Sequence, residues 1–238
     1  MTRREHPPGL ADAAERAGRL RVHASYRPAQ IDGGGDIYDV AETRFGQRVL
    51  IGDVMGTGVP ASETAAGILT AWRAIAPLEP TLVGAAVRLH GLITASPHPE
   101  RFVTAFLLNF DGDPWTEFVC CGHPPPLLLR GDTASFLNGC PVAPPLGLLD
   151  MADGWCATGT FRYTDSDRLL LYTDGVSEAR DAAGAFFPLA ERARAAAHEY
   201  PDHDDGLLGA VMSDLDAHTK GTTRDDVLML TVSRDCSS

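Results

Sequence analysis

The spacing of apolar residues changes along the chain, and each spacing predicts one type of element. Alternation of apolar and polar positions over residues 20–26 predicts a half-buried strand, and the apolar run 48–53 predicts a buried strand. The Gly-rich segment 30–40 that separates them has the composition of a turn. Residues 59–75 and 81–94 carry apolar side chains three and four positions apart, which predicts two successive helices.

The second half of the chain predicts a strand-rich region and then two further helices. Strands are expected at 102–110, 116–122, 126–131, 167–176 and 225–233, helices at 188–200 and 206–218, and a short helix near the N-terminus at 11–18. Strands and helices do not alternate regularly here, and this arrangement favours an α+β fold in one domain. We expect residues 1–19 to form an N-terminal extension and residues 20–235 to form the domain.

Composition and charge argue against some classes of binding partner. The 238 residues carry a net charge of −12, whereas a protein that binds nucleic acid or an anionic membrane needs a basic face. The sequence has no apolar stretch long enough for a signal peptide or a membrane helix. Its five cysteines are scattered and odd in number, as in proteins of a reducing compartment. We therefore expect a cytoplasmic protein.

Aspartates follow or precede several of the predicted strands. Asp36 comes after three glycines, Asp53 and Asp174 each end an apolar run, and Asp225 and Asp226 precede the last strand. Carboxylates at strand ends can meet at the rim of a sheet, where a hard cation such as Mg²⁺ or Mn²⁺ removes their mutual repulsion. Aspartate is equally typical of turns and of solvated strand ends. The spacing alone leaves both interpretations open.

Seven segments, in order, resemble the PP2C-like (PPM) serine/threonine phosphatases, in particular their bacterial SpoIIE/RsbU-type branch. Together they span about residues 20–234, and the segments VLIGDVMGTGVPAS and DRLLLYTDGVSEARDAAGAFF are the most specific. The seven cover residues 26–40, 49–62, 101–111, 121–130, 144–149, 167–187 and 224–232.

The resemblance implies a fold, a cofactor and a reaction. The fold is a four-layer αββα sandwich, in which two antiparallel sheets are flanked by helices. The cofactor is Mn²⁺ or Mg²⁺, as a pair of ions. The reaction is hydrolysis of phosphoserine or phosphothreonine by metal-activated water, without a phosphoenzyme.

The resemblance also assigns the metal site and its catalytic carboxylates. Asp36 matches the first acidic ligand, Asp53 the ligand that bridges both ions, and Val54 the backbone carbonyl ligand. Asp174 matches the ligand in the DG segment. The last ligand matches Asp225, and Asp226 is its alternative if the alignment shifts by one residue.

Three positions bear on the mechanism. The better-known eukaryotic members place an arginine for the substrate phosphate where this chain has Asp32, and a histidine where it has Met55. The metal ions are then expected to hold the phosphate, and water to protonate the leaving group. His123 lies between a glycine and three prolines, and we expect it to have a structural role.

The resemblance points to a substrate class and leaves alternatives. The expected partner is a phosphorylated anti-anti-sigma factor of the STAS type, and the chain is a possible homodimer. One alternative is a docking module that keeps the fold without turnover, which a missing ligand would favour; none is missing from the sequence. Another is a phosphatase for small phosphate esters.

Overall fold

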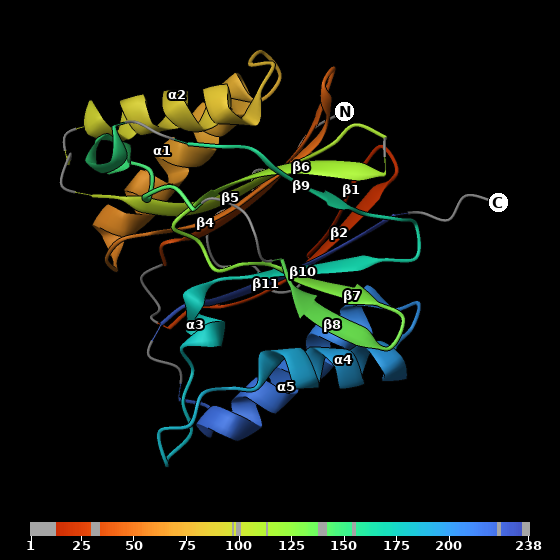
Figure 1. Ribbon diagram of the computed structural model, residues 1–238. Helices are drawn as coiled ribbons and strands as arrows, with labels where there is room; N and C mark the ends of the chain where they lie inside the picture. Colours follow the sequence, from red (N-terminus) through yellow and green to blue (C-terminus); the bar gives the residue numbers. More distant parts are fainter. Residues whose placement is uncertain are drawn as a thin grey trace.

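Two antiparallel sheets lie face to face in the computed structural model, and a pair of helices covers the outer face of each sheet (Figure 1). The structure describes residues 13–29, 34–96, 98, 101–112, 114–137, 142–153, 156–222 and 225–234.

The five-stranded sheet carries the first two predicted site residues. Its strand order is β3-β4-β5-β6-β9. The strands are β3 (Asp36–Thr43), β4 (Gly46–Val54), β5 (Val103–Phe110), β6 (Trp115–Cys121) and β9 (Gly159–Arg162). In the β3–β4 pair Asp36 lies opposite Asp53, so the hairpin brings these two residues together at its open end.

The six-stranded sheet supplies the other acidic residues of the candidate site. Its order is β1-β2-β11-β10-β7-β8. The strands are β1 (Ala13–Ala17), β2 (Leu20–Arg27), β7 (Leu127–Arg130), β8 (Thr133–Phe136), β10 (Arg168–Tyr172) and β11 (Val227–Arg234). Asp174 follows the end of β10, and Asp225 and Asp226 precede β11, its antiparallel neighbour. These residues therefore lie at one end of the sheet.

The helices pack on the sheets through their apolar faces. The helices α1 (Val59–Ile75) and α2 (Leu82–Thr94) cover the five-stranded sheet, and α4 (Leu189–Glu199) and α5 (Asp204–Thr219) cover the six-stranded one. The short elements are α3 (Asp174–Ser177) and a 3₁₀-helix (Leu149–Ala152). The Thr81 side chain caps α2 by accepting a hydrogen bond from the Gly84 N–H. Within the described part of the chain, no helix is long and apolar enough to cross a bilayer.

Three apolar clusters correspond to the three interfaces between the four layers. One joins α1 and α2 to the five-stranded sheet and contains the fully buried Trp72. A second fills the space between the sheets, where Phe106 stacks on Phe118 with ring centroids 5.1 Å apart. The third joins α4 and α5 to the six-stranded sheet. Each sheet is thus apolar on both faces, which fixes the two sheets relative to each other.

A buried arginine ties the α1–α2 connection to the five-stranded sheet. Arg48 on β4 is 0% exposed, and its guanidinium donates hydrogen bonds to the carbonyls of Ala76, Glu79 and Pro80 and to the side chain of Asn109. These bonds give partners to polar groups that would otherwise be buried without them.

The predicted α+β fold and four-layer sandwich are confirmed, as are the two central helices, of which α1 has the predicted bounds. The helix predicted at 11–18 is wrong, because residues 13–17 form β1, which pairs with β2 through a turn at Gly18 (φ +55°); residues 11 and 12 lie outside the described part. The strand predicted at 167–176 ends at Tyr172. The short strands β8 and β9 were not predicted. The turn predicted at 30–40 is wrong for residues 36–40, which belong to β3 because they pair with β4.

Candidate metal centre

Three of the predicted ligands belong to one hairpin of the five-stranded sheet. Asp36 begins β3, Asp53 is its cross-strand partner near the end of β4, and Val54 follows. Cross-strand partners in an antiparallel pair have their Cβ atoms about 4.5–5.5 Å apart and on the same face. The Val54 N–H donates to the Gly35 carbonyl (3.1 Å), which extends the pairing beyond the first residue of β3.

Gly35, the last of the three glycines, makes room for this close approach. A Cβ at Gly35 would overlap the carbonyl oxygen of Val54 and lie 2.8 Å from Oδ1 of Asp53. A side chain at this position would therefore occupy the space beside two of the predicted donor atoms.

Burial and mutual repulsion raise the pKa values of the carboxyl groups in the hairpin. Burial is the largest cause for Asp36, and the charge of Asp53 is the next; together they raise the pKa of Asp36 well above its usual range. Burial, followed by the charges of Asp174 and Asp225, raises the pKa of Asp53 to about 7. Asp174 and Asp225 therefore lie close enough to Asp53 to disfavour its ionised form.

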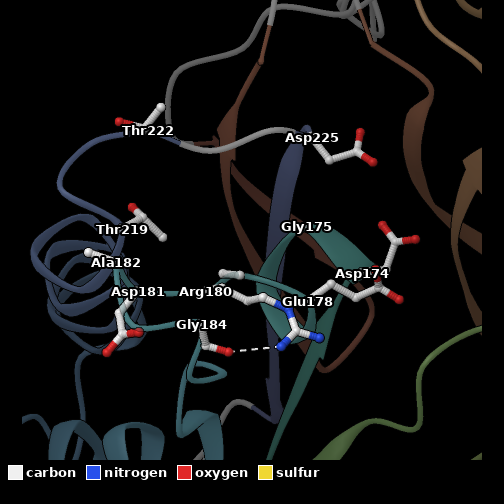
Figure 2. A pocket seen from close by; sticks show the side chains of 11 residues that line it. Asp174, Gly175, Glu178, Arg180, Asp181, Ala182, Gly184, Thr219, Thr222 and Asp225 are labelled. Atoms are coloured by element: carbon white, nitrogen blue, oxygen red, sulfur yellow. Dashed lines mark hydrogen bonds between the residues drawn. The ribbon is translucent and has the colours of Figure 1, made fainter.

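Asp174 and Asp225 face the hairpin from the six-stranded sheet. Burial and then the charges of Asp225 and Glu178 raise the pKa of Asp174, so these carboxylates are also neighbours. Asp174 and Asp225 line a cavity of about 410 Å³. Figure 2 shows the two side chains on separate segments at the same end of this cavity.

Asp226 has different surroundings from Asp225. Only 6% of Asp226 is exposed, and its two carboxylate oxygens accept hydrogen bonds from the backbone N–H groups of Ala29 (2.8 Å) and Gly35 (3.1 Å). Asp225 accepts one hydrogen bond, from the Asp226 N–H (2.9 Å). Asp226 thus ties the start of β11 to the segment after β2 and to the residue before β3, whereas Asp225 borders the cavity.

Thr173, which the sequence reasoning did not single out, connects the two sheets at the site. Its hydroxyl donates to Oδ2 of Asp36 (2.8 Å) and accepts from the Leu228 N–H (3.1 Å). The bond orients the Asp36 carboxylate from the opposite sheet and partly offsets the raised pKa of Asp36. The only sequence signal for this role is its place directly before Asp174.

His123 lies behind the site and is buried, with 5% of its surface exposed. Its Nδ1 is 3.0 Å from the Thr104 hydroxyl, and Thr104 is the cross-strand partner of Asp53 on β5. Burial lowers the pKa of His123 to about 3, so the ring is neutral at physiological pH. This placement is in keeping with the structural role predicted for it.

The donor set has the chemistry of a site for hard cations. Asp36, Asp53, Asp174 and Asp225 offer carboxylate oxygens and Val54 offers a backbone carbonyl, and Mg²⁺ and Mn²⁺ prefer such ligands. Burial and then the repulsion between neighbouring carboxylates raise the pKa values of Asp53 and Asp174, and a cation among these groups would offset the repulsion. Among the described residues, no three His, Cys, Asp or Glu side chains already form a group that could hold a metal ion. The predicted ligands share one region, therefore, without a preformed coordination shell.

Comparison with protein families and curated proteins gives a consistent result. Residues 44–235 match the family model of Stage II sporulation protein E (SpoIIE). Over 162 residues, 65% of this chain, the sequence is 30% identical to the phosphoserine phosphatase RsbP of Bacillus subtilis. The match covers 39% of the length of RsbP.

Solved structures share the fold at lower sequence identity. The RsbU and RsbW domains of Rv1364c from Mycobacterium tuberculosis match 92% of this chain and 62% of their own, with a TM-score of 0.78 and 24% identity. The PP2C phosphatase domain of SpoIIE from Bacillus subtilis, with a regulatory fragment, covers 92% of this chain with a TM-score of 0.70 and 16% identity; the match spans 64% of that chain. RsbX in complex with magnesium covers 94% of this chain, and all of its own, at a TM-score of 0.67 and 14% identity.

Proposed function

The chain belongs to the SpoIIE family, and on that premise we propose that it is a metal-dependent phosphoprotein phosphatase, which hydrolyses phosphoserine or phosphothreonine. The observation that carries the proposal is the meeting of four aspartates at one rim of the two sheets, where burial and then their mutual repulsion raise the pKa values of Asp53 and Asp174.

Asp36, Asp53, Asp174 and Asp225, with the Val54 carbonyl, would hold Mn²⁺ or Mg²⁺, as a pair of ions. Such ions, when bound, supply positive charge for the phosphoryl oxygens and lower the pKa of water that serves as the nucleophile. The magnesium complex of RsbX supports this choice of cation. Asp225 is the better candidate for the last ligand, because both oxygens of Asp226 already accept backbone hydrogen bonds.

The protein's own groups position the site and hold its protons. The Thr173 hydroxyl fixes one oxygen of Asp36 and leaves the other for a cation. The pKa of Asp53 is about 7, so its carboxyl group holds a proton part of the time at neutral pH, and cation binding would release that proton. Met55 has no proton to donate, so we propose that water protonates the leaving group.

The substrate class also belongs to the proposal. We expect a phosphorylated anti-anti-sigma factor of the STAS type, in the cytoplasm. RsbP is named a phosphoserine phosphatase, which supports a phosphorylated serine as the substrate group. The mycobacterial structure contains RsbU and RsbW domains, which supports a role in the regulation of sigma factors. The chain spans 39% of RsbP, so activity, substrate and partners are proposals for this chain.

The test compares phosphate release in Mn²⁺ with release in EDTA. The substrates are p-nitrophenyl phosphate and a phosphoserine peptide, and the proteins are the wild type, Asp174→Asn and the control Asp132→Asn, whose side chain is 89% exposed. We expect release only with Mn²⁺, loss of at least about 100-fold in Asp174→Asn, and no change in the control. Equal release in EDTA would exclude the metal mechanism. Absence of release from every substrate, with Mn²⁺ still bound, would favour the docking module.

A further inference from the structure

A short hairpin forms one wall of the cavity beside Asp174. It comprises residues 179–187, directly after α3, and is called the Arg180 hairpin below. Arg180 and Phe186 form an antiparallel bridge across it. Oδ1 of Asp181 accepts hydrogen bonds from the N–H groups of Ala183 and Ala185, both at 2.8 Å. These bonds fix the turn of the hairpin in one conformation.

The hairpin is also anchored to α5. The Phe187 ring is 5% exposed and meets the His218 ring edge-on, with ring centroids 5.5 Å apart. Nε2 of His218 donates to the Ala185 carbonyl (3.0 Å). The hairpin therefore has a defined position relative to the six-stranded sheet, and the side chains it presents to the cavity are held in place.

Arg180 is a cation on this wall. Its Nη1 donates to the Gly184 carbonyl (2.8 Å), and its guanidinium carbon lies 3.6 Å from the centroid of the Phe186 ring. Both contacts hold the guanidinium plane, and both belong to the hairpin itself. Figure 2 shows the hydrogen bond to Gly184 as a dashed line.

The guanidinium keeps most of its hydrogen-bonding capacity. Arg180 shares the cavity with the carboxylates of Asp174, Glu178, Asp181 and Asp225, yet forms no ion pair with any described residue. A guanidinium has five N–H donors, and the bond to Gly184 uses one of them. A rigid cation with free donors, beside a site proposed to act on phosphate esters, is arranged for an oxyanion.

We infer that Arg180 binds an oxyanion of the substrate in this cavity and thereby contributes to the affinity for phosphoproteins. The inference rests on the proposed phosphatase function. The oxyanion is either the phosphoryl group itself or a carboxylate that flanks the phosphoserine in the protein substrate. Planar, bidentate recognition suits both groups.

The experiment uses the full chain and three variants. Arg180→Ala removes the cation, and Arg180→Lys keeps the charge but loses the planar fork. Arg44→Ala is the matched control, because Arg44 is exposed and stacks on its neighbour Phe45 (4.7 Å) in the turn at the opposite end of the β3–β4 hairpin from Asp36. KM and kcat are measured with Mn²⁺ for p-nitrophenyl phosphate and for two phosphoserine peptides, one with acidic and one with neutral flanking residues. Inhibition by inorganic phosphate is measured in parallel.

If the phosphoryl group is the ligand, Arg180→Ala should raise KM for all three substrates, and the inhibition constant of phosphate, by about 5- to 20-fold. If a flanking carboxylate is the ligand, only the KM for the acidic peptide should rise. In both cases Arg180→Lys should be intermediate and Arg44→Ala unchanged. Wild-type values for Arg180→Ala with every substrate and with phosphate would overturn the inference.

The inference can be tested separately from the phosphatase function. If the wild type releases no phosphate, calorimetric titration with inorganic phosphate and with the acidic peptide replaces the kinetics. Weaker binding of either probe to Arg180→Ala than to Arg44→Ala would then support oxyanion binding although the catalytic proposal had failed. Equal binding of both probes would overturn it.

Discussion

Replacement of Asp53 by asparagine should stabilise the protein in the absence of metal. Burial, followed by the charges of Asp174 and Asp225, raises the pKa of Asp53 to about 7, compared with about 3.9 for an aspartate in an unfolded chain. Between these two pH values the folded state holds a proton that the unfolded state has released. Wild-type stability therefore falls as the pH rises through this window and levels off above about pH 7.

The size of the effect follows from this difference in pKa. About three pH units, at about 1.4 kcal/mol per unit, give an upper limit of about 4 kcal/mol at pH 8. Relaxation of the neighbouring side chains reduces this figure, and we expect about 2–4 kcal/mol. A chain of this length loses about 2 °C of Tm per kcal/mol, so Asp53→Asn should melt about 4–8 °C above the wild type.

The assay is thermal unfolding in EDTA from pH 4 to pH 8, repeated at pH 8 with Mn²⁺. The advantage of Asp53→Asn should be absent near pH 4 and should grow up to about pH 7, whereas the exposed control Asp132→Asn should follow the wild type throughout. Mn²⁺ should raise the Tm of the wild type and leave that of Asp53→Asn almost unchanged. If Asp53→Asn is no more stable than the wild type at pH 8 in EDTA, the explanation by burial and repulsion of the Asp53 carboxylate is wrong.

Three further predictions separate ligands from structural residues. In EDTA, Asp225→Asn should melt within about 2 °C of the wild type yet need much more Mn²⁺ for activity. Asp226→Asn should instead lose about 2–3 kcal/mol in urea unfolding, because one of the two backbone N–H groups that it holds, of Ala29 or of Gly35, then lacks its acceptor. The opposite pattern would exchange their roles. Thr173→Val should raise the Mn²⁺ concentration for half-maximal activity several-fold, since Asp36 loses its donor; an unchanged value would refute this. Arg48→Met should cost about 3 kcal/mol or more in urea unfolding, because several buried carbonyls lose their donor; a cost below about 1 kcal/mol would contradict it.

Helices and strands could be predicted from the sequence where their apolar pattern extends over many residues. The apolar stripe of α1 repeats over seventeen residues, and its predicted bounds are those of the structure. β1 and β8 have five and four residues, too few to show a period, and each exists because a neighbouring strand provides its hydrogen-bond partners. The helical composition of residues 13–17 was overridden by the hairpin with β2.

Only part of the candidate site could likewise be predicted from the sequence. Asp53 and Asp174 could be picked out because each ends an apolar run, and Asp225 because it precedes one. Asp36 follows three glycines, and the family resemblance assigned each aspartate its place among the ligands. The surroundings of Asp226 and the contact of Thr173 with Asp36 depend on segments more than 130 positions apart in sequence, and no local pattern encodes them. The Arg180 hairpin has its place because it packs on α5, which local sequence also does not show.

The division of the four aspartates between the two sheets has a thermodynamic consequence. Asp36 and Asp53 belong to one sheet, whereas Asp174 follows strand β10 of the other sheet and Asp225 precedes its strand β11. A cation held by both pairs binds only when the sheets are docked at the correct spacing, so its binding free energy adds to the stability of docking. By reciprocity, a partner that shifts one sheet against the other changes metal affinity by the same free energy, without touching a ligand. A change in the spacing between the sheets would therefore change the affinity of the site for a cation.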